Sequence, residues 1–113
     1  MDREKDKVFF CKSGDISYRI ALDQILYFKS EGRRLICHTA QRDYSFYGKL
    51  DEVQQRLGSS FVRIHQRYLV RCAAVDRFSP GQVSLGAEVL PVSRSCQQSA
   101  MLALAHDSLE DML

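Results

Sequence analysis

Short alternating or apolar segments, separated by turn residues, follow one another along most of this sequence. Strand-like segments lie at residues 7–12, 16–21, 26–30, 33–39 and 42–47. The breaks between them carry turn residues such as Ser13-Gly14-Asp15 and Glu31-Gly32, where glycine accepts a positive φ. Strands this short and this evenly spaced predict small antiparallel sheets.

The second half of the sequence adds further strands and two helices. Residues 83–85 and 88–90 are expected to pair around Gly86-Ala87. Residues 48–57 predict a helix, because three apolar residues share one stripe and two acidic residues fall in the first turn. Ser93 is suited to cap a second helix from residue 94 to about residue 105, and residues 106–113 could continue this helix or fray. The predicted fold class is therefore mostly β with two short helices.

Length and composition indicate one ordinary globular domain. The 113 residues allow a single core, which we expect over about residues 7–105, followed by an acidic tail over 106–113. No apolar run reaches the length needed to span a membrane. Because the first residues also lack the apolar stretch of a signal peptide, a cytoplasmic location is expected.

The charge is unevenly distributed, although the whole chain carries only +2. Residues 26–72 hold nine basic against four acidic residues, whereas residues 95–113 hold three acidic residues and no lysine or arginine. Eleven of the sixteen basic residues are arginine, which favours planar, two-pronged recognition of phosphates or bases. This pattern suggests one face for a polyanion and another kept away from it.

Residue patterns typical of enzymes and metal sites are absent from the sequence. The four cysteines form no Cys-x-x-Cys pair, so reduced, packed thiols are expected. The histidines His38, His65 and His106 fall in separate predicted elements, and no glycine-rich phosphate loop occurs. We therefore expect no enzymatic activity, no cofactor and no metal.

Residues 61–71 combine apolar and basic side chains in alternation. In an extended strand, Val62, Ile64, Tyr68 and Val70 would share one face. The opposite face would then carry Arg63, His65, Arg67 and Arg71. A solvated basic face would explain this pattern, and so would a surface that donates to phosphates or base edges.

Three motifs in this sequence together resemble the LytTR family of bacterial DNA-binding domains. The first is Phe61-x-Arg63-x-His65-x-x-Tyr68-Leu69-Val70, the second is Leu90-Pro91-Val92-Ser93-Arg94, and the third is Ile25-Leu26-Tyr27-Phe28-Lys29-Ser30-Glu31. They occur in the family's order and the resemblance covers roughly residues 7–105. It implies a transcriptional regulator that binds specific double-stranded DNA through loops on one side of small sheets.

The resemblance also implies which residues contact DNA. Loops at Glu31-Gly32, after His65 and at Ser93-Arg94 would enter successive grooves. Base contacts are expected from Arg33 (with Arg34 as the fallback), Gln66 and Arg94. Contacts to the DNA backbone, or bracing of the loops, are expected from Lys29, Arg34, Arg63, His65, Arg67 and Ser93, with Arg42 a further phosphate candidate. Without the resemblance, solvated surface side chains would explain most of these residues, and His65 could be purely structural.

The expected partner is DNA with repeated half-sites, occupied by a dimer or a cooperative pair. The family often carries a preceding receiver domain, so this chain could be a stand-alone member or the output domain of a response regulator. Arg71 departs from the family, which commonly has asparagine at that position. The alternative function is a β-rich protein–protein interaction module whose basic face meets an acidic partner.

Overall fold

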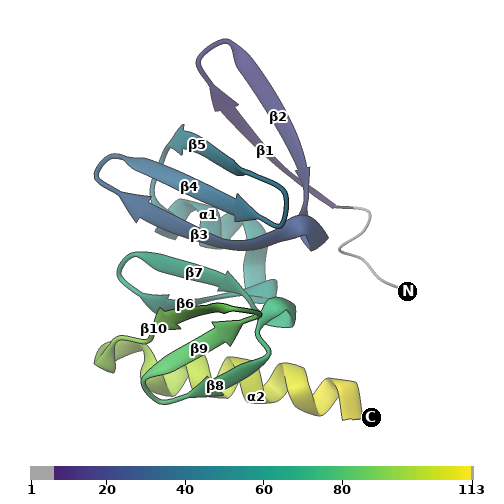
Figure 1. Ribbon diagram of the computed structural model, residues 1–113, viewed down its shortest axis with the longest axis vertical. Helices are drawn as coiled ribbons and strands as arrows, with labels where there is room; N and C mark the ends of the chain where they lie inside the picture. Colours follow the sequence, from purple (N-terminus) through teal and green to yellow (C-terminus); the bar gives the residue numbers. More distant parts are fainter. Residues whose placement is uncertain (1–6, 113) are drawn as a thin grey trace.

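The computed structural model describes the backbone of residues 7–112 and the side chains of residues 7–106. In this part of the chain, small antiparallel sheets and two helices confirm the predicted fold class (Figure 1). The strands are β1 (Val8–Ser13), β2 (Ile16–Ala21), β3 (Ile25–Glu31), β4 (Arg34–Thr39), β5 (Asp43–Tyr47), β6 (Phe61–His65), β7 (Tyr68–Arg71), β8 (Arg77–Ser79), β9 (Gln82–Leu85) and β10 (Glu88–Pro91). The helices are α1 (Leu50–Leu57) and α2 (Gln97–Met112), and the 3-10 turns are η2 (Leu22–Gln24), η3 (Gly58–Ser60), η4 (Cys72–Ala74) and η5 (Arg94–Cys96). Helix α2 continues through residues 106–112 of the predicted tail, whose acidic side chains lie outside the described residues.

Three antiparallel sheets follow one another along the long axis of the molecule (Figure 1). Strands β1 and β2 form a separate hairpin at one end. The middle sheet has the order β5-β4-β3-β7-β6, and the order β10-β9-β8 forms the sheet at the other end, next to α2. The principal extents of the molecule are 42 × 34 × 26 Å. Because neighbouring strands are antiparallel, the tight turns of the middle sheet emerge at its two ends.

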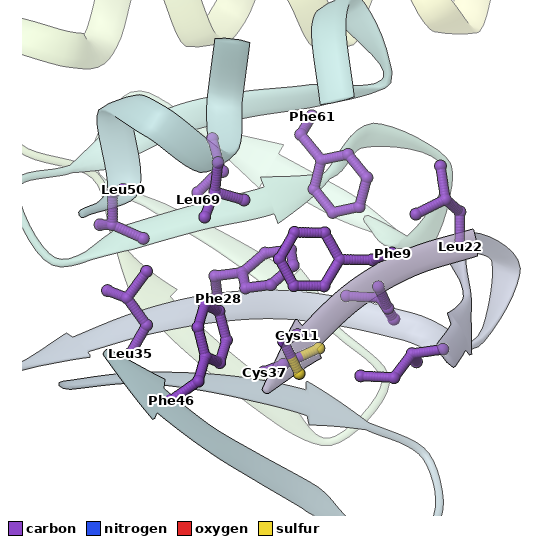
Figure 2. Packing of buried hydrophobic residues seen from close by; sticks show 13 residues of the cluster. Phe9, Cys11, Leu22, Phe28, Leu35, Cys37, Phe46, Leu50, Phe61 and Leu69 are labelled. Atoms are coloured by element: carbon purple, nitrogen blue, oxygen red, sulfur yellow. The ribbon is translucent and has the colours of Figure 1, made fainter. Parts of the chain in front are cut away.

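One face of the middle sheet packs against the β1–β2 hairpin and α1 (Figure 2). Phe28 on β3 is fully buried there, and its ring centroid lies 5.0 Å from that of Phe9 on β1. Phe46 and Phe61 complete this aromatic cluster, at 6.3 and 5.7 Å from Phe28. Full burial of one such side chain contributes about 1.5–3 kcal/mol. The hairpin and the helix are therefore held to the sheet mainly by apolar contact.

The opposite face of the middle sheet is buried as well. Val62, Ile64 and Val70 on β6 and β7 pack in a second cluster with residues of the three-stranded sheet and α2. That cluster also contains Tyr27, Cys72, Val83, Leu85, Leu90, Val92, Ala100 and Leu104. The middle sheet is thus covered on both faces, which explains why β6 and β7 have consecutive buried residues rather than strict alternation.

The prediction of one extended, two-faced strand over residues 61–71 is wrong. The chain folds back at Gln66-Arg67, so that β6 and β7 pair as a hairpin with a register shift between Arg63 and His65. The four basic residues therefore do not share one face: Arg67 lies exposed in the turn, and His65 binds the backbone of that turn. Arg63 and Arg71 bind backbone carbonyls instead.

Two predicted helix starts also differ from the structure. The first helix begins at Leu50 rather than Gly48, with Lys49 at its N-cap. After Ser93 the chain forms the 3-10 turn η5, and α2 begins only at Gln97. Ser93 makes no side-chain capping hydrogen bond; its backbone carbonyl accepts from the N–H of Cys96 at 3.0 Å. The backbone N–H of Ser93 is at the same time bound to the carbonyl of Ile64 on β6.

The cysteine side chains pack as small apolar residues. Cys11, Cys37 and Cys72 are buried, Cys96 is half-buried, and all four are free thiols. Figure 2 shows Cys11 on β1 and Cys37 on β4 within the same core cluster. Burial raises the pKa of the Cys11 and Cys37 thiols, which keeps them protonated and unreactive.

A polar cluster links the middle sheet to the three-stranded sheet. His38 Nδ1 lies 2.5 Å from the Asp43 carboxylate on β5, and its Nε2 lies 2.8 Å from the Glu88 carboxylate on β10. The hydroxyl of Tyr27 donates to the second oxygen of Glu88 at 2.9 Å. Burial alone would lower the pKa of His38, but the hydrogen bonds and charges of Asp43 and Glu88 outweigh it and raise that pKa.

We expect this cluster to make stability depend on pH. The contribution of the His38 ion pairs is fully present below the pKa of an unfolded histidine, about 6.5, and is lost as pH rises through the higher folded-state pKa. Urea unfolding of the wild type and of His38→Gln, from about pH 6 upward, measures the contribution of these ion pairs to stability. The difference between their unfolding free energies should shrink as pH rises. A pH-independent difference would contradict the ion-pair assignment.

Arg71 braces the start of the middle sheet. Its Nε donates to the carbonyl of Ile25 at 2.6 Å and its Nη2 donates to the carbonyl of Asp23 at 3.1 Å. The carbonyl of Asp23 lies within η2 and that of Ile25 just beyond its end, where a helical turn leaves acceptors unsatisfied. Arg71 thus fixes the turn that leads into β3.

Replacement of Arg71 by alanine should destabilise the domain by about 2–3 kcal/mol, because charged hydrogen bonds to partly buried carbonyls are lost. Arg77→Ala is a suitable control, since Arg77 is exposed and surface substitutions usually stay within about 0.5 kcal/mol. Chemical denaturation of both variants gives the two values. Equal values would show that the carbonyl contacts of Arg71 contribute nothing.

Candidate nucleic-acid interface

The turn between β3 and β4 forms the first bend. Gly32 has a φ of +62°, which allows the tight reversal between Glu31 and Arg34. Arg33 lies within this turn, whereas the sequence predicts it one residue further, at the start of the strand. Its side chain is exposed and makes no hydrogen bond or ion pair with residues 7–106. Arg33 is therefore available to a ligand.

The basic residues beside the first bend already have partners. Arg34 Nε donates to the hydroxyl of Ser45 at 2.7 Å, and its guanidinium stacks 4.9 Å from the ring centroid of Tyr47. Lys29 pairs with Glu31 at 3.1 Å, and this hydrogen bond raises the pKa of Lys29. Both cations remain accessible at the surface but are held in place along the strands.

The turn between β6 and β7 forms the second bend, and Arg63 holds it closed. Arg63 Nε donates to the carbonyl of His65 at 2.8 Å, and its Nη2 donates to the carbonyl of Gln66 at 2.8 Å. Its Nη1 pairs with Asp51 on α1 at 2.6 Å. All three nitrogens of the guanidinium are engaged, so the geometry gives Arg63 a bracing position rather than an open one.

His65 adds a second brace to the same bend. Its Nδ1 accepts from the backbone N–H of Arg67 at 3.1 Å, so the neutral ring carries its proton on Nε2. The ring also packs edge-on to Tyr68, with centroids 5.7 Å apart. The side chains of Gln66 and Arg67 are exposed and bind no other residue of the described part of the chain. The turn thus presents one amide and one guanidinium from a fixed backbone.

The third bend follows β10 and leads into α2. The N–H of Ser93 donates to the carbonyl of Ile64 on β6 at 2.8 Å, and the N–H of Val92 donates to the carbonyl of Gly81 at 3.0 Å. The Ser93 hydroxyl contacts that of Ser95 at 3.4 Å. Arg94 is exposed, without a hydrogen bond or ion pair to residues 7–106. Backbone contacts therefore fix this bend, while Arg94 extends freely from it.

The three bends lie on the same side of the molecule. Lys29 pairs with Tyr68 across β3 and β7, and the N–H of Ser30 donates to the carbonyl of Arg67, so the first two bends are neighbours. The Ser93–Ile64 bond brings the third bend to the same end of the middle sheet. Figure 1 shows the three bends in succession along the left side, parallel to the long axis.

Arg42 is the predicted phosphate candidate that does not join this group. It stacks on Tyr18 and Tyr44, at 5.4 and 4.6 Å, in the connection between β4 and β5. That connection lies at the opposite end of the sheet from Arg33, because β4 runs the full length between them.

The expectations for Arg63 and His65 included bracing of the loops, but the sequence did not reveal Asp51 as a partner of Arg63. Arg63 lies on β6 and Asp51 on α1, and no periodic pattern in the sequence relates these two positions. The only available signal was the acidic first turn of the helix, which the helix dipole explains equally well.

In the described part of the chain, no group of three or more His, Cys, Asp or Glu side chains could hold a metal ion. None of the described helices has the length and apolar character to cross a membrane.

The sequence and the fold of this chain are both similar to known proteins. The family model for the LytTr DNA-binding domain matches residues 15–105. The structure is similar to the LytTr DNA-binding domain of a methyl-accepting/DNA response regulator from Bacillus cereus, with a TM-score of 0.76 and 19% sequence identity. This similarity covers 87% of the present chain and 96% of the other. No curated protein sequence matches the chain significantly. Since the family model spans most of its length, this chain belongs to the LytTR family of DNA-binding domains.

Proposed function

We propose that this domain recognises a specific double-stranded DNA sequence with side chains at its three bends. The observation that supports this most directly is the contrast among the basic residues. Arg33, Gln66 and Arg94 are exposed and unengaged, whereas Arg63 and His65 are bound to the backbone of the turn that presents Gln66. A rigid turn with an unengaged side chain suits base recognition, because a turn that must become ordered on binding reduces the affinity.

The dimensions of the molecule suit contact with successive grooves. Major grooves on one side of B-form DNA recur about every 34–36 Å, one helical turn. The longest extent of the domain is 42 Å, and the bends lie along that direction (Figure 1). Arg33 and Arg94 would then enter two major grooves, and Gln66 would face the minor groove between them. Separate loops enter separate grooves best if the DNA bends toward the protein.

The three side chains proposed to contact bases differ in the hydrogen bonds they can make. An arginine that binds guanine O6 and N7 with two hydrogen bonds supplies about 1–3 kcal/mol of discrimination. The amide of Gln66 both donates and accepts, so it can pair with edge atoms in either groove. Lys29, Arg34 and Arg67 would neutralise phosphates, and Ser93 and His65 would donate further hydrogen bonds to them. In this proposal the three base-contacting side chains determine the specificity, and the phosphate-contacting side chains supply most of the affinity.

The proposed biological role is regulation of transcription in the bacterial cytoplasm. Repeated half-sites bound by a dimer, or by two cooperating copies, would lengthen the recognised sequence beyond one domain's reach. A receiver domain in a longer parent chain would supply control, making this domain the output part of a two-component response regulator. Selection of bound duplexes from a random library tests the class and identifies the target.

On the selected duplex, Arg33→Ala should relax the preference at one base pair, with a loss of about 1–3 kcal/mol of discrimination. Arg67→Ala should instead weaken all sequences alike and reduce the slope of log affinity against log salt by about 0.9, for one phosphate. Fluorescence anisotropy across a salt series measures both effects. Identical behaviour of the two variants would contradict the division between base and phosphate contacts. Weak binding without any sequence preference would favour a protein–protein interaction module.

The bracing position of Arg63 can be tested with its charge retained. Arg63→Lys cannot donate to both turn carbonyls, so amide hydrogen exchange at Gln66 and Arg67 should accelerate. We expect DNA binding to weaken by about 1–2 kcal/mol because the turn must be ordered on binding.

The matched control for this variant is Asp51→Asn. It removes the carboxylate charge beside Arg63 but leaves both carbonyl bonds in place, so its effects on exchange and affinity should be clearly smaller. If Asp51→Asn has the same effect as Arg63→Lys, the ion pair rather than the forked carbonyl contact holds the turn.

A further inference from the structure

A groove next to the first bend is not used by the proposed DNA contacts. It lies between β1 and the segment where β5 leads into α1, and it has a volume of about 320 Å³. Cys11, Phe46 and Val53 form an apolar base, since all three side chains are buried in the underlying core. The groove is therefore backed by rigid, apolar packing rather than by mobile loops.

Two aromatic side chains stand at this groove with most of their surface in water. Phe10 is 51% exposed and Tyr47 is 70% exposed. Phe10 alternates with the buried residues Phe9 and Cys11 on β1, so its side chain points away from the hairpin's own core. Exposed aromatic rings beside a hollow are typical of surfaces that bury an apolar group of a partner.

The charged residues at the groove are predominantly basic. Lys12, Lys49 and Arg56 line it, against the single carboxylate of Glu52. Arg56 is oriented by two contacts: its guanidinium lies 4.7 Å from the Phe9 ring centroid and donates to the carbonyl of Phe10 at 3.2 Å. Lys12 and Lys49 are exposed and make no ion pair with other described residues. The groove thus combines an apolar base with unneutralised positive charge.

We propose that this groove binds an acidic peptide segment of another protein, with an apolar side chain in the hollow and carboxylates beside Lys12 and Lys49. This interaction goes beyond the proposed DNA recognition and uses different residues. Duplex DNA would satisfy the lysines, but it offers no apolar side chain for the base of the groove and the two exposed rings. Because Tyr47 also stacks on Arg34, an occupant would lie directly beside the first bend.

The probe is a fluorescein-labelled peptide in which glutamate alternates with leucine, so that an extended chain presents carboxylates on one side and leucines on the other. We expect saturable binding to the whole domain by anisotropy. Amide chemical-shift changes should cluster on β1, the end of β5 and α1. Peptides with lysine in place of glutamate, or serine in place of leucine, should not bind.

The test variant is the double substitution Lys12→Gln with Lys49→Gln, which should weaken peptide binding about fivefold, as expected for two exposed charge contacts. The matched control is Arg19→Gln with Arg77→Gln, which removes the same net charge from residues that do not line the groove. This control should change the affinity less than about twofold. Thermal unfolding of both doubles verifies their fold.

Several results would overturn the proposal. These are absence of saturable binding, chemical-shift changes elsewhere on the surface, or equal weakening by the control double, which would indicate non-specific charge attraction. Displacement of the peptide by a mixed-sequence duplex, with shifts of the same groove residues, would assign the groove to DNA instead.

Discussion

Burial of the middle sheet on both faces is the constraint on which the rest of this structure depends. On β3, Phe28 is buried against the β1–β2 hairpin, and its neighbour Tyr27 packs on the opposite face against the three-stranded sheet. Neither outer layer could bury its apolar residues without the middle one. Because packed sheets resist deformation, the turns at one end of the sheet keep a fixed spacing. The proposed DNA contacts depend on that spacing.

The basic residues divide into two groups with different consequences. Arg63 and Arg71 donate to backbone carbonyls, at the β6–β7 turn and at η2, whereas Arg33, Arg67 and Arg94 extend from the three bends into solvent. Guanidinium groups suit both uses, since their several donors can satisfy carbonyls at a turn as well as phosphates or bases. The basic excess in the middle of the sequence therefore overstates the charge available to a ligand.

The strands, the hairpins and most of their limits were predictable because each depends on local alternation and on turn residues. The pairing of β9 with β10 around Gly86-Ala87 is an example. The β6–β7 hairpin was mispredicted as one strand, because Gln66-Arg67 contains neither glycine nor proline to mark a turn. The turn exists because Arg63 and His65 hold it, and such contacts leave no periodic pattern. Similarly, Ser93 resembles a helix cap, but a 3-10 turn follows it, and its N–H is bound to Ile64 on a distant strand.

The sequence by itself determined the fold class and the family, because turn residues, alternation and three ordered motifs are local properties of the chain. It also indicated Arg33, Gln66 and Arg94 as candidate contacts through that resemblance. Only the tertiary structure decided which arginines are free, which are braces, and that three bends far apart in the sequence share one side. Those properties arise from strand pairing and from packing between distant segments, and no local pattern specifies either.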